Sequence, residues 1–275
     1  LLLMAPSLAL GEFGVCPPYS KTFGPDDPIE EVQAFVAEAN LRPGGGTLVL
    51  KPANWNYNLG YLSITGTLCV RTTSAGVKPG DAWAEASAYI SVASGGTLTV
   101  QSIKFTGYVI GPTIINVEHG GLFFGDNVFN PYVRNEGSIF LKDSELISWA
   151  NRGFSSIEGS IFIPDETDRE KEEFTNSGYA SLSRVNGGGI SNSGILVVAR
   201  STLNTAEYCY DAGIQEFVCE IVAAIDNVGV AEVANSMVET CEGPVTDLGH
   251  NEFYAGGGCI VTDPTSTYYN GEVVE

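Results

Sequence analysis

The amino-acid sequence predicts an all-β protein, a right-handed parallel β-helix in which short strands stack coil upon coil, with a short capping helix at the N-terminal end. Two observations predict this fold class. The 275-residue chain carries 33 glycines and only 2 methionines, a composition typical of strands joined by tight corners, because glycine adopts turn conformations that other residues resist. In addition, one strand-like pattern recurs along the chain, which is typical of solenoids.

The recurring pattern is a glycine followed by two apolar residues that alternate with other residues, then a turn and a large apolar residue. Its copies begin at Gly46, Gly96, Gly120, Gly137, Gly159 and Gly194. From Gly96 onward they are 24, 17, 22 and 35 residues apart. Because successive strand side chains point to opposite faces, the alternation predicts two interior ladders. One ladder contains Leu98, Leu122, Ile139, Ile161 and Leu196, and the other contains Val100, Phe124, Leu141, Ile163 and Val198.

A β-sandwich built from hairpins is the alternative fold. Hairpins favour two-residue Asn-Gly or Asp-Gly turns between their strands. The two Asn-Gly pairs of this chain, at 186–187 and 270–271, are not at hairpin positions. The repeats therefore favour the β-helix.

The clearest helix signal lies directly before the first repeat, in an N-terminal segment at residues 12–43. Asp27 is expected to cap this helix and Pro28 to take its first position. The Arg-Pro-Gly-Gly sequence at 42–45 ends it. One helix face is apolar through Ile29, Val32, Val36 and Ala39. We expect the helix to cover the open end of the solenoid, whose strand edges would otherwise be exposed.

The rest of the chain divides into three parts. Residues 1–11 resemble the end of a secretory signal, an apolar run that closes on small residues and is too short to span a bilayer. Residues 44–204 hold the repeats, and residues 205–275 are predicted to form cysteine-rich, irregular coils. An even number of cysteines without a Cys-x-x-Cys pair favours disulfides in an oxidising compartment over zinc, with the connectivity open. The six are Cys16, Cys69, Cys209, Cys219, Cys241 and Cys259.

Two stretches of the chain carry a family resemblance. The amphipathic helix, the sequence Gly-Gly-Thr-Leu-Val-Leu-Lys-Pro at 45–52 and the strand-like run 61–70 resemble the opening of the pectin-lyase-like β-helix superfamily. Residues 174–180, 187–190 and 194–198 resemble the repeats of polymorphic outer-membrane-type β-helix proteins. The resemblance spans about 27–206 and implies a right-handed β-helix. It also implies that polysaccharide lyases, glycoside hydrolases and esterases are among the activities to consider.

The charge of the chain disfavours anionic binding partners. With 33 acidic and 13 basic residues, the formal net charge is −20, so nucleic acid and anionic membrane surfaces would be repelled. No segment approaches the ~20 consecutive apolar residues of a membrane-spanning helix. We therefore expect neither nucleic-acid binding nor a membrane span.

One column of the repeat is a candidate metal site. The seventh position of the repeat, counted from its glycine, holds Asp126, Asp143 and Asp165 in three successive copies. If the register holds, these carboxylates stack about 4.8 Å apart, and a hard cation such as calcium would relieve their repulsion. The alternative is that each carboxylate points into water. No other cofactor and no catalytic residue is predicted, since the preceding column, Lys51, Gln101, Gly125, Lys142, Pro164 and Ala199, forms no basic cluster.

These features favour a secreted or cell-surface protein with a structural or adhesive, non-enzymatic role. Its acidic solenoid surface would meet extracellular polysaccharide, matrix proteins or neighbouring copies of the chain. The alternative is a polysaccharide-active lyase or glycoside hydrolase, because one fold hosts both kinds of function.

Overall fold

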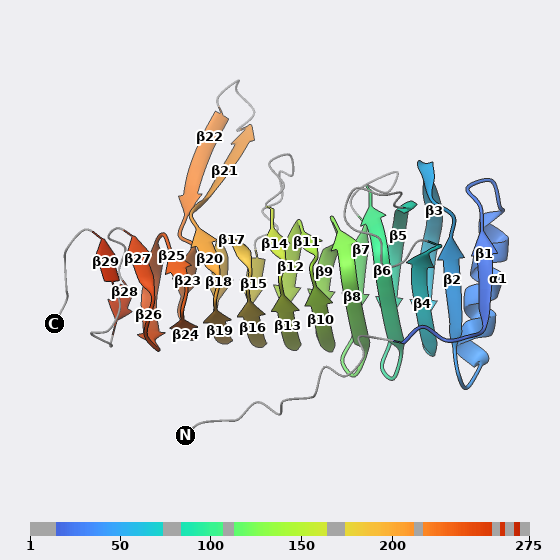
Figure 1. The fold of residues 1–275 in the computed structure, drawn as a ribbon, viewed down its shortest axis with the longest axis horizontal. Coiled ribbons are helices and arrows are strands. Elements are labelled where there is room, and N and C mark those ends of the chain that lie inside the picture. Colours follow the sequence, from blue (N-terminus) through green and yellow to red (C-terminus); the bar gives the residue numbers. More distant parts are fainter. Residues whose placement is uncertain are drawn as a thin grey trace.

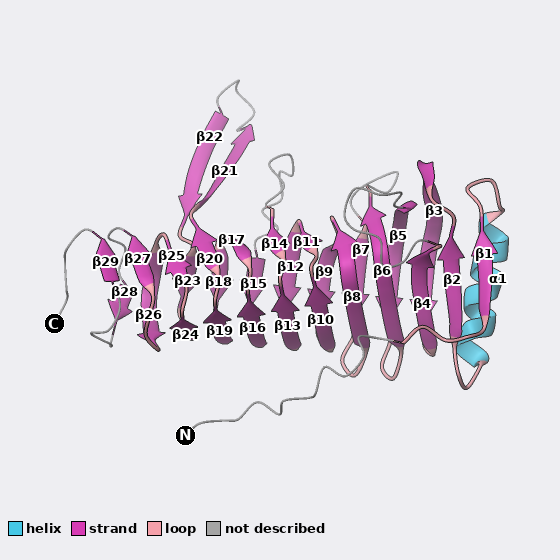
Figure 2. Ribbon diagram, in the orientation of Figure 1, coloured by secondary structure: helices cyan, strands magenta, loops and turns pink. Residues whose placement is uncertain are grey.

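The computed structural model describes residues 15–73, 84–106, 113–163, 174–211, 217–254, 259–261 and 267–269. Over these ranges the chain is a parallel β-helix, in which strands follow one another along one long axis with a helix at one end (Figures 1 and 2). The predicted fold class is confirmed.

Three columns of parallel strands, here called faces A, B and C, form the walls of the solenoid. Face A begins with β1 (Ser20–Phe23) and β2 (Gly46–Leu50) and continues through β4 (Thr67–Thr72), β6 (Thr97–Phe105), β8 (Leu122–Phe129), β10 (Ser138–Lys142), β13 (Phe154–Glu158), β16 (Tyr179–Ser183), β19 (Ile195–Ala199), β24 (Val230–Ala234), β26 (Cys241–Asp247) and β28 (Cys259–Val261). Each strand pairs with the strand of the next coil.

Faces B and C are built in the same way. Face B contains the ends of β6 and β8, then β11 (Glu145–Leu146), β14 (Ile161–Phe162), β17 (Asn186–Gly188), β20 (Thr202–Asn204), β25 (Met237–Val238), β27 (Glu252–Tyr254) and β29 (Thr267–Tyr269). Face C contains β3 (Ala53–Ile64), β5 (Ala84–Val92), β7 (Ile114–Val117), β9 (Tyr132–Asn135), β12 (Ser148–Asn151), β15 (Phe174–Asn176), β18 (Ile190–Asn192) and β23 (Ile225–Asn227).

The compact coils repeat every 16 residues, as between the equivalent Asn135 and Asn151. Longer coils carry insertions. The largest separates Asn192 from its equivalent Asn227, 35 residues later. It contains the antiparallel hairpin of β21 (Ala206–Asp211) and β22 (Phe217–Val222), which projects from the solenoid (Figure 1).

The helix α1 (Ile29–Leu41) covers the N-terminal end of the solenoid, as predicted (Figure 2). Its buried side chains, Val32, Phe35, Val36 and Ala39, join the core. The predicted cap is wrong, because Pro28 takes the N-cap position without a side-chain hydrogen bond. Asp27 instead accepts a hydrogen bond from the Gly24 amide at 2.6 Å, within the preceding turn.

The interior ladders are confirmed in part. Leu98, Val100, Ile139, Leu141, Leu196 and Val198 are all buried. The repeat predicted to begin at Gly120, however, begins at Gly121. The pairing of Leu98 with Phe123 shows this shift of one residue. Phe123 therefore fills the core, whereas Leu122 and Phe124 point outward.

The copy predicted at Gly159 is also misplaced. Ile161 and Ile163 are each 43% exposed, and Phe162 between them is buried. This stretch belongs to face B, since Ile161 pairs with Glu145. The strand of face A in that coil is β13, which follows Gly153.

The corrected register places one glycine per coil at the turn before face A. These are Gly66, Gly96, Gly121, Gly137, Gly153, Gly178, Gly194 and Gly229, each two residues before a mutually paired interior residue. A side chain would have no room there. A Cβ at Gly153 would lie 2.2 Å from the Gly137 carbonyl oxygen, and one at Gly178 would lie 2.2 Å from that of Gly153.

The same stacking continues beyond residue 204, so the C-terminal coils are more regular than predicted. Ile190 pairs with Ile225 and Val198 with Val233, and further strands pair as far as Tyr269. The repeat beginning at Gly229 escapes notice in the sequence because the β21–β22 insertion separates it from the repeat before.

A ladder of buried asparagines runs through five coils at the turn from face C to face A. Asn135, Asn151, Asn176, Asn192 and Asn227 are each 1% exposed. The Nδ2 of each of the first four donates to the Oδ1 of the next at 2.6–2.7 Å. The last donates to the Pro244 carbonyl. The core is thus held by side-chain hydrogen bonds as well as by apolar packing.

Candidate functional site

The most distinctive surface of the protein is an apolar strip on the outward side of face A. It consists of Leu122, Phe124, Phe140, Phe154, Tyr179, Ile195 and Val230, on β8, β10, β13, β16, β19 and β24, and is called the outward strip below. Leu122, Ile195 and Val230 are 36%, 41% and 50% exposed, and the aromatic members are half-buried. Contiguous apolar surface of this kind marks interaction sites on soluble proteins.

The aromatic rings of the outward strip are stacked on one another. Phe124 and Phe140 have ring centroids 5.1 Å apart with an angle of 12° between planes, and Phe154 and Tyr179 lie 5.3 Å apart at 2°. Phe140 and Phe154 join the two pairs at 5.6 Å. The two middle rings, Phe140 and Phe154, therefore have a neighbouring ring on both sides and present mainly their edges to solvent.

Sequence reasoning missed this strip, since it placed Leu122 and Phe124 in the core, Phe154 in no repeat, and Tyr179 in a repeat-like stretch that was not aligned with the others. The signal that could have found it is the run of apolar residues at 122–124. In such a run, one register buries Phe123 and exposes its two neighbours, and the other register does the reverse. Because two adjacent glycines, Gly120 and Gly121, precede the run, the sequence pattern fits both registers.

Charged side chains lie along the edge of face A that borders face B. Asp126 pairs in register with Lys142, which in turn pairs with Glu158. Burial raises the pKa of the Asp126 carboxyl; the positive charge of Lys142 opposes this increase in pKa, and the negative charge of Asp143 adds to it. Glu158 is paired with the guanidinium of Arg184 at 2.5 Å.

The predicted aspartate column does not form in the predicted register. Asp126 aligns with Lys142, and Asp143 is one residue further on, at the corner, where its backbone has a φ of 48°. Asp165 lies outside the described residues. Among the residues that the structure describes, no group of three or more acidic, histidine or cysteine side chains could hold a metal ion. Calcium binding itself stays an untested prediction.

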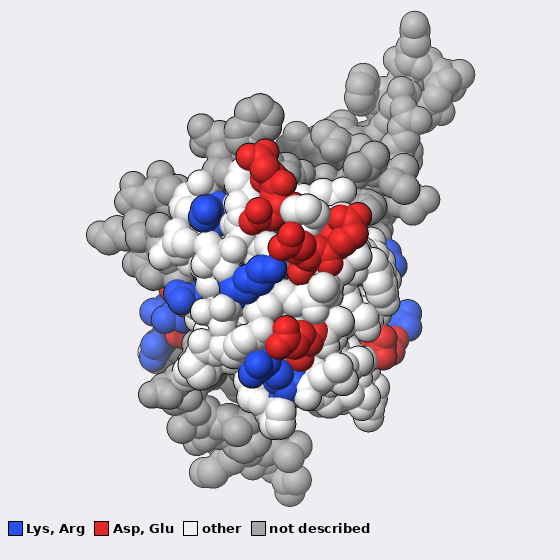
Figure 3. All heavy atoms as spheres, turned by 90° about the vertical axis from the view of Figure 1, so that its right-hand side faces the viewer, with Lys and Arg blue, Asp and Glu red and all other residues white. Residues whose placement is uncertain are grey.

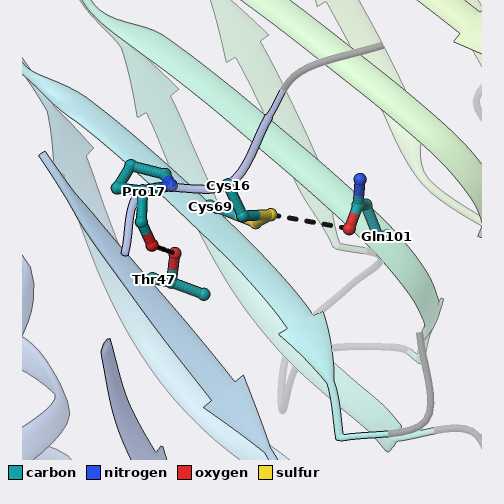
Figure 4. Close-up of a disulfide and its surroundings, with 5 residues drawn as sticks. All are labelled: Cys16, Pro17, Thr47, Cys69 and Gln101. Carbon is teal, nitrogen blue, oxygen red and sulfur yellow. Dashed lines mark hydrogen bonds between the residues drawn. A yellow bond between two sulfur atoms is a disulfide. The ribbon is translucent and has the colours of Figure 1, made fainter. Parts of the chain in front are cut away.

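The N-terminal segment covers the outward side of the first strands of face A, before the outward strip begins (Figure 4). A disulfide joins Cys16 to Cys69 on β4, and the Cys16 sulfur lies 3.5 Å from Gln101 Oε1 on β6. The Thr47 hydroxyl on β2 donates to the Pro17 carbonyl at 2.6 Å. The segment thus crosses β2 and β4 and reaches β6, and the outward strip begins at the next strand, β8.

The cysteines give a first testable prediction. Cys16 and Cys69 are bonded, Cys241 is bonded, and no described cysteine is free. In the hairpin, Cys209 stands directly opposite Cys219, a separation that suits a disulfide, which leaves Cys259 for Cys241. We expect thiol titration of denatured, unreduced protein to find no free group, and peptide mapping to find these three pairs. Six free thiols would contradict an oxidising compartment.

Two other surfaces are less suited to a partner. A shallow depression of about 170 Å³ on face C is lined by hydroxyl side chains such as Thr175 and Ser191, with Asp226 beside them. At the capped end, acidic and basic side chains are interspersed (Figure 3). Two ion pairs, Lys21–Glu31 and Arg42–Glu38, lie on this end.

The chain matches no known protein-family model, no curated protein and no solved structure. Within its described residues, no helix has the length and apolar character needed to cross a membrane.

Proposed function

We propose that this protein is a non-enzymatic structural and adhesive β-helix that acts outside the cell or at the cell surface. The observation that carries the proposal is the outward strip. It holds half-exposed aromatic rings and exposed aliphatic side chains on six consecutive strands. A rigid, flat, apolar face of this extent is suited to holding another surface rather than to enclosing a small substrate.

Three features support an extracellular structural role. The Cys16–Cys69 disulfide fixes the N-terminal segment across three strands, and disulfides persist in oxidising compartments. The capping helix protects the first coil from edge-to-edge association. The asparagine ladder holds five coils in one register. Together they favour a durable scaffold.

The chemistry of the strip favours apolar partners. Both ring faces of Phe140 and Phe154 lie against neighbouring rings, which leaves little ring face in the middle of the strip for a sugar to stack on. The net charge of −20 repels polyanions. Matrix proteins or other copies of the chain therefore suit the strip better than an anionic polysaccharide does.

One observation favours the alternative, a polysaccharide-active enzyme resembling the pectin-lyase-like superfamily. Burial raises the pKa of the Asp126 carboxyl against the opposing charge of Lys142, and the negative charge of Asp143 adds to the increase. A carboxyl of raised pKa near a second carboxyl is an arrangement that glycoside hydrolysis uses. The enzyme would therefore act at the edge of face A.

Incubation with a panel of neutral and anionic polysaccharides, with and without calcium, separates the two functions. We expect neither unsaturated products nor new reducing ends. In parallel, retention on surfaces coated with matrix proteins should fall several-fold in Phe154→Ser and stay unchanged in Tyr61→Ser, an exposed aromatic position on face C. Turnover that disappears in Asp126→Asn but persists in Glu232→Gln would replace the adhesive proposal with the enzyme.

A further inference from the structure

We propose that the outward strip is a self-association surface, on which a second copy of this chain packs face to face. The inference rests on the proposed function, since it names the partner of the same surface. It comes from the arrangement of side chains over six strands, from β8 to β24.

The outward side chains of these strands form three columns. The pairing from β8 to β24 is continuous, without a register shift. The first column is Leu122, Ser138, Phe154, Tyr179, Ile195 and Val230. The second is Phe124, Phe140, Ser156, Ser181, Val197 and Glu232. The third is Asp126, Lys142, Glu158, Ser183, Ala199 and Ala234.

The favourable arrangement has a two-fold axis that lies between the two copies, parallel to the strands and midway between β13 and β16. It keeps each column over itself and reverses the order of the strands. In the first column, Leu122 then faces the partner's Val230, and Phe154 faces the partner's Tyr179. In the second column, Phe140 faces the partner's Val197. In these pairs apolar side chains meet apolar side chains on both copies, and the two mismatches are Ser138 against the partner's Ile195 and Phe124 against the partner's Glu232.

The third column avoids like charges in this arrangement. Lys142 faces the partner's Ala199, Asp126 faces the partner's Ala234, and Glu158 faces the partner's Ser183. The charged end of the column therefore meets the uncharged end, and no two carboxylates are brought together. Because two close carboxylates would repel each other, this pattern removes the main electrostatic obstacle to pairing two acidic chains.

The other symmetric arrangement is unfavourable. A two-fold axis along the solenoid places the first column over the third, so that Leu122 meets the partner's Asp126 and Phe154 meets the partner's Glu158. The same axis keeps the second column over itself, so that Glu232 meets the partner's Glu232, and two like charges brought together at an interface are costly. The strip therefore specifies one relative orientation of the two copies.

The size of the strip sets the strength of association. Six strands about 4.8 Å apart and five residues long cover roughly 24 by 16 Å, or roughly 400 Å² on each copy. A stable interface buries about 800 Å² on each partner. We therefore infer a weak, reversible dimer, suited to adhesion through many copies at once.

Sedimentation velocity between about 10 µM and 1 mM tests the inference. The wild-type protein should shift from monomer to dimer over this range, as weak contacts do. Two substitutions at one half-buried site test the orientation. Ala199→Glu would face the partner's Lys142 and should tighten the dimer about threefold or more, whereas Ala199→Lys should weaken it by a similar factor. Both effects should shrink at high salt.

Controls separate association from folding. The two variants at position 199 should unfold at the same temperature as the wild type, and Tyr61→Ser on face C should leave dimerisation unchanged. A wild-type protein that stays monomeric at about 1 mM would overturn the inference while leaving adhesion to another partner in place. So would two position-199 variants that shift the equilibrium in the same direction. Polysaccharide turnover would instead overturn the proposed function and leave a measured dimer standing.

Discussion

Alanine at Gly178 is expected to destabilise the β-helix by about 3 kcal/mol or more, because overpacking against backbone cannot be relieved by a side-chain rotation. The added Cβ would lie 2.2 Å from the Gly153 carbonyl oxygen and 2.7 Å from the Arg152 carbonyl carbon. Both are backbone atoms of the preceding coil. Two coils would have to separate locally, and the adjoining pairing of β13 with β16 would be strained.

The matched control is Gly44→Ala. Gly44 precedes Gly46 by two residues, as Gly66 precedes its partner Leu68, so both glycines belong to the same column. Nothing lies within 4 Å of a Cβ at Gly44. We expect this variant to unfold within ~0.5 kcal/mol of the wild type, and Gly178→Ala to lose roughly 6–12 °C in its thermal midpoint. Equal midpoints for the two variants would show that the column is not closely packed.

The glycine column also explains how far the sequence could predict the fold. The pattern of a glycine followed by alternating apolar residues is sufficient to indicate stacked coils, since it reflects this packing requirement. The pattern does not fix the register where two glycines are adjacent. Gly120 and Gly121 offer two registers, and only the pairing of Leu98 with Phe123 selects the second.

The candidate site was less predictable, because outward positions follow no packing requirement. Because the predicted register was wrong by one residue at Gly120, Asp126 was aligned with Asp143. In the structure Asp126 pairs with Lys142. The same error hid Phe124 among the core residues. The outward strip also depends on contacts between coils of different length, such as Phe154 with Tyr179, which the sequence does not place side by side.

The asparagine ladder was not predicted, although its spacing follows the coils. Asn135 and Asn151 are 16 residues apart, and Asn151 and Asn176 are 25 apart across an insertion. Each Nδ2 of these rungs donates to at least two acceptors. Asn176, for example, donates to Asn192 Oδ1 at 2.7 Å and to the Ile195 carbonyl at 3.0 Å. Because the rungs are buried, water cannot replace a lost donor.

Replacing Asn176 with alanine is therefore expected to cost about 2–4 kcal/mol, since it leaves buried polar groups on both neighbouring rungs without their partners and opens a small cavity. Asn135→Ala should cost less, about 1–2 kcal/mol, because Asn135 is the first rung and only one asparagine loses a bond. Asn186→Ala, at an exposed position, should change stability by no more than ~0.5 kcal/mol. Urea unfolding of the three variants measures this gradient.

Asn176→Asp tests whether the donated hydrogen bonds, rather than the shape of the side chain, hold the ladder. The carboxylate would face two acceptors, Asn192 Oδ1 and the Ile195 carbonyl oxygen, so burial and these contacts should raise its folded-state pKa above the ordinary value of about 4. A group with a raised acid pKa destabilises the folded state at neutral pH, and the loss diminishes as pH falls through the folded-state pKa, because the protonated acid can donate once. The difference from wild type should therefore be larger at pH 7 than at pH 4.5 in urea titrations. A difference that is the same at both pH values would show that the donors of the ladder contribute little to stability.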